Sequence, residues 1–269
     1  QAKDAGVKDE ALEIFVVQLQ SEPSLNPKAS PDEIIDCFEE NQNELFPAIK
    51  LRELGKYKEA CKWLNRFLSN NPKNPEALSL LSQVLLLDKK VLEAEKALKE
   101  AASFNPDLPS IFRNQARLLL KQSKNKEALD KAHVFVKSPK DLESQLVLAA
   151  CFSANQRDLE ALPIIEKILK AEPNHAEAYA NRALIKLRAK DTVGAIEDAE
   201  MTVSLKPHLT QMWLLLGSLY YQDNNLSDAI EALRSAHKNE PENSDFMVQL
   251  GEFLRQDNKV SEAIIIFEQ

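Results

Sequence analysis

An alanine that returns about every 34 residues constrains the fold of this sequence more than any other feature. The intervals between successive members of the series are 34, 34, 33, 34, 34 and 34 residues. The series is Ala60, Ala94, Ala128, Ala161, Ala195, Ala229 and Ala263. A fixed period of this length is typical of small helical or strand units that stack in a row, because one unit alone cannot bury its apolar face. The period therefore predicts a repeat protein whose neighbouring units share a continuous core.

Each repeat is predicted to contain two helices, and the repeat at 210–243 illustrates the pattern. Its first half carries apolar or small residues at i, i+3, i+4 and i+7, starting from Trp213. An Asp-Asn-Asn turn follows at 223–225. The second half places Ala229 on an apolar helical face, and Pro241 ends it because proline cannot continue a helix.

A small residue stands twelve positions before each alanine of the series. These seven residues are Ala48, Ser82, Ala116, Ala149, Ala183, Gly217 and Gly251. Small residues that face each other let two helix backbones approach closely, while bulkier neighbours fill the space around them. We therefore expect both sets to be buried where the two helices of a repeat meet.

A 34-residue helix–turn–helix unit with this pattern resembles the tetratricopeptide repeat family. The residues that carry the resemblance are Trp213, Leu216, Gly217, Tyr220, Ala229, Leu233, Ala236 and Pro241, with Tyr179, Ala183, Ala195, Ala199 and Pro207 in the repeat before. The repeats are set at 41–74, 75–108, 109–141, 142–175, 176–209, 210–243 and, in part, 244–269. The resemblance implies an all-α fold: a right-handed superhelical solenoid of antiparallel helix pairs.

In the tetratricopeptide family the first helix of every repeat lines an extended concave groove. For this chain the resemblance implies a mixed wall of amides, apolar side chains and one basic stripe. The candidate peptide-binding residues on that wall are Arg52, Gln83, Arg113, Asn114, Arg117, Lys121, Asn181 and Tyr221.

Arg113, Arg117 and Lys121 stand at i, i+4 and i+8, so they form the basic stripe along one helix. The same positions in the adjacent repeats hold no acidic residue. We therefore expect the stripe to anchor a carboxylate or an acidic peptide, since the arginine fork can bind a carboxylate through two hydrogen bonds. The alternative is that the stripe meets solvent or pairs with acids from a second helix.

Asn181 matches the central asparagine of heat-shock co-chaperones that grip a C-terminal carboxylate. The other positions of that clamp, which should hold lysine, asparagine and arginine, hold Leu146, Ala150, Gln211 and Leu215. This departure from the family pattern argues against binding of chaperone tails. An array of inner asparagines, as in O-linked glycosyltransferases, is also missing from the sequence, because only Asn114 and Asn181 occupy that position.

Composition excludes several classes of function. The chain has only 5 glycines in 269 residues, too few for a P-loop or a Rossmann fingerprint. Its net charge of −8 opposes binding to nucleic acid, and no apolar run is long enough for membrane insertion. Three distant cysteines form neither a disulfide framework nor a zinc motif, and the four histidines have no metal-ligand spacing. We expect no catalytic residue, metal or cofactor.

The two ends of the chain do not follow the repeat pattern. Residues 1–40 are expected to form a capping and linker segment with two short helices, the second of which starts at a capping box from Ser30 to Glu33. The apolar stretch at 8–20 either caps the first repeat or occupies a groove on this chain or a neighbour. The apolar strip at 264–267 implies that the chain continues, or that self-association covers this edge.

These observations favour a non-catalytic protein-interaction scaffold that binds a peptide or protein segment. The alternative is the repeat region of a longer enzyme, such as a glycosyl- or sulfotransferase, with its catalytic domain beyond residue 269. RNA binding by a helical-repeat relative is a third possibility, which the acidic balance opposes. The compartment stays open; unpaired cysteines fit a reducing one such as the cytoplasm, and no signal peptide is visible.

Overall fold

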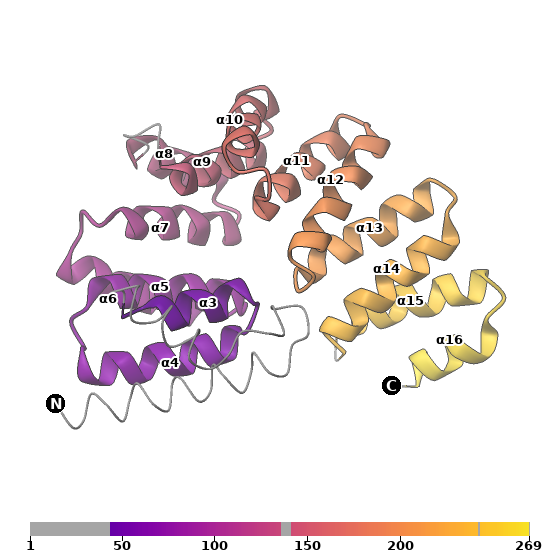
Figure 1. Ribbon diagram of the computed structural model, residues 1–269, viewed down its shortest axis with the longest axis horizontal. Coiled ribbons are helices and arrows are strands. Elements are labelled where there is room, and N and C mark those ends of the chain that lie inside the picture. The colour runs from indigo at the N-terminus through magenta and orange to yellow at the C-terminus, as the bar shows by residue number, and fades with distance from the viewer. Residues whose placement is uncertain (1–43, 136–140, 242, 269) are drawn as a thin grey trace, which may run out of the picture. The chain divides into compact units, whose positions relative to one another are not determined.

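The structure, a computed structural model, describes residues 44–135, 141–241 and 243–268. Within these ranges the chain forms fourteen helices and no strand, which confirms the predicted all-α fold (Figure 1). The two helices expected within 1–40 lie outside the described residues. The helices are α3 (Phe46–Glu53), α4 (Tyr57–Asn70), α5 (Pro75–Leu87), α6 (Val91–Phe104), α7 (Pro109–Lys121), α8 (Asn125–Phe135), α9 (Leu142–Ala154), α10 (Asp158–Ala171), α11 (Ala176–Arg188), α12 (Thr192–Leu205), α13 (Thr210–Gln222), α14 (Leu226–Asn239), α15 (Ser244–Gln256) and α16 (Val260–Phe267).

Each predicted repeat holds two of these helices, and the alanine series is buried throughout. Every alanine of the series is at most 3% exposed, and the seven small residues that precede them are buried as well. The first helix of the first repeat is short. Pro47 occupies its first turn, and α3 begins at Phe46, the late start that a proline at this place predicts.

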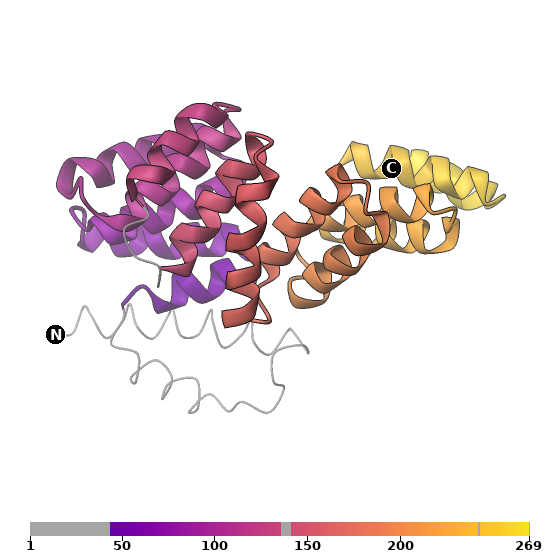
Figure 2. The same ribbon diagram turned by 90° about the horizontal axis from the view of Figure 1, so that it is seen from above.

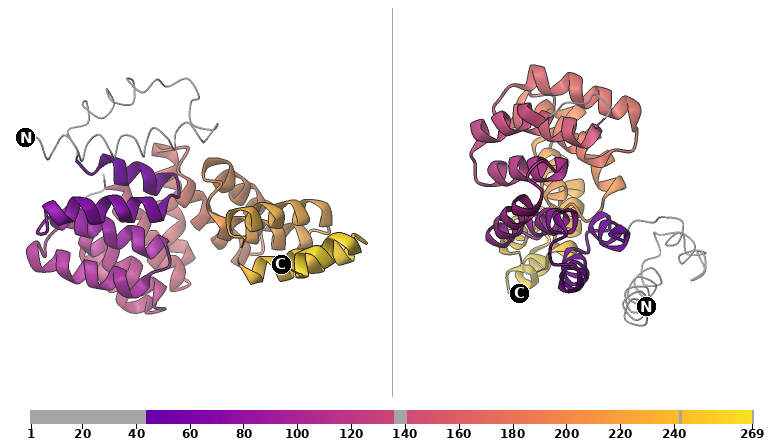
Figure 3. Two further views of the ribbon diagram at one scale, coloured as in Figure 1. Left: turned by 90° about the horizontal axis from the view of Figure 1, so that it is seen from below. Right: turned by 90° about the vertical axis from the view of Figure 1, so that its left-hand side faces the viewer.

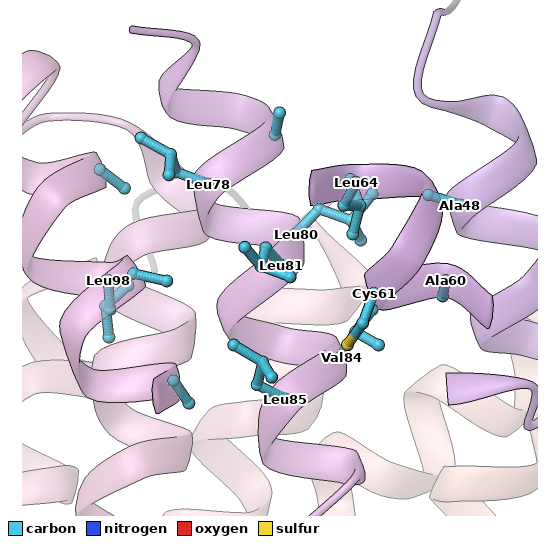
Figure 4. Packing of buried hydrophobic residues seen from close by; sticks show 14 of the residues in the cluster. Ala48, Ala60, Cys61, Leu64, Leu78, Leu80, Leu81, Val84, Leu85 and Leu98 are labelled. Atoms are coloured by element: carbon cyan, nitrogen blue, oxygen red, sulfur yellow. The ribbon is translucent and has the colours of Figure 1, made fainter. Parts of the chain in front are cut away.

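By packing, the chain divides between Leu118 and Leu119 into an N-terminal unit and a C-terminal unit. In the N-terminal unit α3 packs on α4, α4 on α5 and α5 on α6 (Figure 2). Its core is a continuous aliphatic cluster, in which Cys61 lies beside Val84 and Leu64 beside Leu80 (Figure 4). Adjacent repeats thus share one core, as the period predicts.

The C-terminal unit repeats the same packing. The pairs α11/α12, α13/α14 and α15/α16 each pack closely, and α12 and α14 contact the first helix of the next pair (Figure 3). One core cluster joins Ala183 and Ala199 to Leu216 and Ala232, and a second joins Leu233 to Leu250. Each second helix therefore contributes to the cores of two successive repeats.

The turn inside every described repeat has the same backbone geometry. Its fifteenth residue has a positive φ of 58–73°, and in most repeats that residue is not glycine. The seven residues are Gly55, Lys89, Ser123, Gln156, Lys190, Asn224 and Asn258. The following N–H donates to a carbonyl five residues back, as from Lys90 to Leu85 over 2.8 Å. This left-handed residue closes the first helix in a Schellman arrangement and turns the chain into the second helix.

Candidate functional site

Side-chain hydrogen bonds join the first helices of the N-terminal unit at the predicted wall positions. Arg52 of α3 donates from Nη1 to Oε1 of Gln83 on α5 over 2.7 Å. Ser79 of α5 donates from Oγ to Oγ of Ser110 on α7, also over 2.7 Å. The first bond lies among partly exposed side chains, whereas Ser79 in the second is fully buried. The partly exposed polar residues of these helices, here called the first-helix face, are Arg52, Gln83, Arg113 and Arg117.

Asn114 lies beneath this face instead of on it. Its side chain is only 1% exposed. Nδ2 donates to the backbone oxygen of Ser79 over 2.8 Å and to its Oγ over 3.1 Å, while Oδ1 accepts from Nη1 of Arg117 over 3.0 Å. The expectation that Asn114 is exposed on the wall is therefore not met, because its side chain is buried. Asn114 is buried between α5 and α7, and there its side chain holds the Arg117 guanidinium in place.

The basic stripe lies along α7 as the sequence spacing requires. Arg113 and Arg117 are half-buried, and Lys121 is exposed in the last turn of the helix. Arg113 and Arg117 lie on a helix that contains no acidic residue. Their half-burial matters because charged hydrogen bonds are stronger where water is partly excluded.

The two candidates of the C-terminal unit lie on different helices. Asn181 is half-buried on α11, and Tyr221 of α13 is 42% exposed. The Tyr221 ring stacks on Phe253 of α15, with centroids 4.5 Å apart and planes 11° from parallel. No hydrogen bond or ring contact among the described residues joins Asn181 to Tyr221. Phe253 was not among the predicted site residues, although it falls on the first helix of the last repeat.

The cationic side chains of α11, the helix that carries Asn181, are paired with carboxylates. Asp198, nearly fully buried on α12, accepts two hydrogen bonds of 2.7 Å from Arg182 and lies 3.0 Å from Lys186. The hydrogen bond with Asp198 raises the pKa of Arg182 above its ordinary value. Arg188 likewise pairs with Asp158 over 2.6 Å. Each of these cations is thus paired with a carboxylate of a neighbouring helix.

Among the described residues, no arrangement of side chains would support metal or redox chemistry. No group of three or more histidine, cysteine, aspartate or glutamate side chains in the described ranges could hold a metal ion. Burial, followed by the nearby Asp88 carboxylate, raises the pKa of the Cys61 thiol to about 11, which keeps it protonated. Among the described helices, none combines the length and apolar character needed to cross a bilayer.

Two family models match this sequence. The model of the tetratricopeptide repeat matches residues 214–269. The model described as anaphase-promoting complex, cyclosome, subunit 3 matches residues 53–133. The first match lies wholly within the C-terminal unit and the second lies mostly within the N-terminal unit, so repeats in each unit have a known counterpart.

Curated relatives and solved structures agree with these matches. The chain is 23% identical over 207 residues to Hsp70-Hsp90 organizing protein 3 of Arabidopsis thaliana, covering 72% of this chain and 36% of that protein. It is 27% identical over 203 residues to the human protein O-mannosyl-transferase TMTC3, covering 73% of this chain and 22% of that protein. The chain therefore spans about a third or less of the length of these relatives.

A solved structure supports the fold independently. The thermophilic tetratricopeptide repeat protein TTC0263 of Thermus thermophilus superposes with a TM-score of 0.59 at 20% identity, covering 67% of this chain and 99% of that one. The 34-residue period, the paired helices with buried alanines and the family match all indicate the same assignment. This chain is a member of the tetratricopeptide repeat family.

Proposed function

We propose that this chain is a non-catalytic scaffold that binds a peptide or protein segment on the first helices of its repeats. Tetratricopeptide repeats generally mediate contacts between proteins, and stacked helix pairs offer an extended surface for them. The single observation that carries the proposal is the set of hydrogen-bonded polar side chains on the first helices of the N-terminal unit, where Arg52 bonds Gln83 and Arg117 is held by the buried Asn114. Such preorganised side chains lose little conformational entropy when a ligand binds.

The chemistry of the first-helix face supports an acidic partner. Guanidinium groups bind carboxylates through two parallel hydrogen bonds, and half-buried arginines are common anchors of protein interfaces. Nucleic acid is a poor candidate because the whole chain carries a net charge of −8. In the C-terminal unit, Tyr221, Phe253 and Asn181 supply an aromatic and amide surface for neutral residues of the same or another ligand segment.

Capture with the intact chain tests this proposal. The immobilised protein is exposed to a lysate of its source, and bound proteins are quantified by mass spectrometry and mapped by limited proteolysis. Arg117→Glu is compared with the control Lys96→Glu, which makes the same charge change at an exposed position on the second helix α6. The proposal expects a partner that the parent and the control retain and that Arg117→Glu loses. Equal recovery by all three proteins would refute a role for this face.

A second candidate function rests on one comparison. The human relative is named as an O-mannosyl-transferase, and the chain covers 22% of it. On this alternative, the repeats belong to a longer enzyme and position its substrate. Sequencing the complete gene decides between the two: a transferase domain on the same chain supports the enzyme, and an open reading frame of repeats alone supports the scaffold.

Self-association through the last helix is a further part of the proposal. Ile264, Ile265 and Phe267 of α16 are each about half exposed, so an apolar strip faces outward. Light scattering at rising concentration, with and without residues 264–269, tests this. Oligomers that vanish on removal of the strip support it, and monomers throughout refute it. Within the described part of the chain, the buried cysteines Cys61 and Cys151 form no disulfide, which fits a reducing compartment such as the cytoplasm.

A further inference from the structure

The α15/α16 pair has fewer packed neighbours than the α13/α14 pair before it. In the part of the chain that the structure describes, α13 and α14 pack closely on a helix at either side, α12 and α15, whereas the α15/α16 pair packs closely on α14. The stability of one solenoid repeat is approximately the sum of its own stability and that of its interfaces with neighbouring repeats. A pair with one such interface therefore opens locally more readily than a pair with two.

A core cluster and an exposed ion pair join α15 and α16 to α14. In the cluster, Leu233 of α14 packs with Leu250 and Leu254 of α15. The ion pair joins Arg234 of α14 to Glu262 of α16, and both side chains are about half exposed. Exposed ion pairs contribute little to stability because water and salt screen them. The cluster is therefore the main contact on this side of the junction.

The stack of Tyr221 on Phe253 adds a contact on the side of the first helices. Phe253 packs against the same core cluster, and its ring lies 4.5 Å from the Tyr221 ring of α13, centroid to centroid. Tyr221 is 42% exposed, and among the described residues its hydroxyl makes no hydrogen bond. One aromatic contact thus connects the interior of the α14/α15 interface to an exposed residue of the candidate site.

We propose that this stack couples Tyr221 to the local opening of α15 and α16. While the pair is closed, the Tyr221 ring has a fixed aromatic neighbour; when the pair opens, the ring loses that neighbour. A segment that contacts both rings then holds α15 and α16 closed, and its affinity is reduced by the fraction of protein in which they are open. This last consequence rests on the proposed function, whereas the coupling itself does not.

Hydrogen exchange of the intact chain, resolved helix by helix through mass spectrometry, tests the coupling. Tyr221→Leu removes the stacked ring from α13, a different helix from the two that it should loosen. Aromatic stacking stabilises a contact beyond the effect of its buried area, so we expect exchange in α15 and α16 to become about three- to tenfold faster, with α11 and α12 unchanged.

Two control variants separate the stack from other effects of the substitution. Tyr221→Phe keeps the ring and removes only the hydroxyl, so its exchange should match that of the parent. Leu184→Ala removes an apolar side chain of similar exposure from α11, and it should leave α15 and α16 unchanged.

Phe253→Leu removes the same stack from the side of α15. It should also accelerate exchange in α15 and α16, and it decides the question if Tyr221→Leu fails to fold, which circular dichroism would reveal. The double variant Tyr221→Leu/Phe253→Leu should exchange no faster than Phe253→Leu alone, because one stack can be lost only once. Independent, multiplying effects of the two substitutions would show that the rings are not coupled.

Parent-like exchange of α15 and α16 in Tyr221→Leu would overturn the inference. So would equal acceleration in Tyr221→Phe, or acceleration spread evenly over the C-terminal unit. A chain that captures a partner and lacks the coupling refutes this inference alone. A chain that shows the coupling and captures no partner refutes the proposed function alone.

Discussion

Replacing Gly217 with alanine adds one methyl group between the two helices of the sixth repeat. A Cβ at this position would lie 2.9 Å from Cγ and 3.1 Å from Cδ2 of Leu233, well inside ordinary contact distance. Leu233 is 0% exposed and packs against Ile230, Leu250 and Leu254, so its side chain has no free space to enter. The added methyl must therefore push α13 away from α14.

The expected magnitude follows from two opposing effects. Alanine favours a helix over glycine by about 1 kcal/mol, and overpacking a tight core typically costs about 1–3 kcal/mol. We expect Gly217→Ala to lower the free energy of unfolding by about 1 kcal/mol, despite the better helix propensity.

Gly251→Ala is the matched control in the next repeat. Its Cβ would meet the Phe267 ring at 2.4 Å, but that ring is 49% exposed at the end of α16 and can swing into solvent. Because the helix propensity gain is then not offset by overpacking, we expect the control to be as stable as the parent or up to about 1 kcal/mol more stable. Urea unfolding followed by far-UV circular dichroism, with hydrogen exchange of α13 and α14, measures both variants. A Gly217→Ala protein as stable as the parent would refute the close approach inferred here.

Three further perturbations follow from the buried groups. Ala195→Leu should destabilise the protein by about 1–3 kcal/mol in thermal unfolding, because Ala195 is fully buried; an unchanged melt would contradict the repeat register. Asp198→Asn should lower the free energy of unfolding by about 2–3 kcal/mol, because it leaves Arg182 without its carboxylate. The loss should be smaller than for a deeply buried ion pair, since the cations are partly exposed. Glu160→Gln, at an exposed ion pair, should leave the melting temperature unchanged. With its pKa raised to about 11, Cys61 should react with iodoacetamide at pH 8 about a hundredfold more slowly than an ordinary thiol; equal rates by mass spectrometry would show that the thiol is not shielded.

The repeat period predicted the fold well because it depends on local packing. Small residues at two fixed positions determine which faces of two helices meet, and that information is carried entirely by the sequence. The turn geometry was only partly predictable. Gly55, Asn224 and Asn258 are residue types that favour a left-handed backbone, but Lys89 and Lys190 are not, and only the repeat register assigns them the same conformation.

The candidate site was less predictable because it depends on contacts between repeats. From its position in the helix, Asn114 is expected on the exposed wall. In the structure its side chain donates two hydrogen bonds to Ser79 and is buried beneath the surface. The stacking of Tyr221 on Phe253 joins residues 32 positions apart, and neither residue type at its own position requires the other. Sequence periodicity identifies the face; the depth of each side chain on it depends on neighbouring repeats.

The central claim is that the first-helix face of the N-terminal unit recognises an acidic protein segment. Its most direct test is calorimetric titration of the segment mapped in a captured partner against the parent, Arg117→Glu and Lys96→Glu at low and high salt. We expect Arg117→Glu to weaken binding by about 2 kcal/mol, roughly thirtyfold, and Lys96→Glu to bind like the parent. The parent's affinity should also fall with salt. Equal dissociation constants for the parent and Arg117→Glu would contradict the claim.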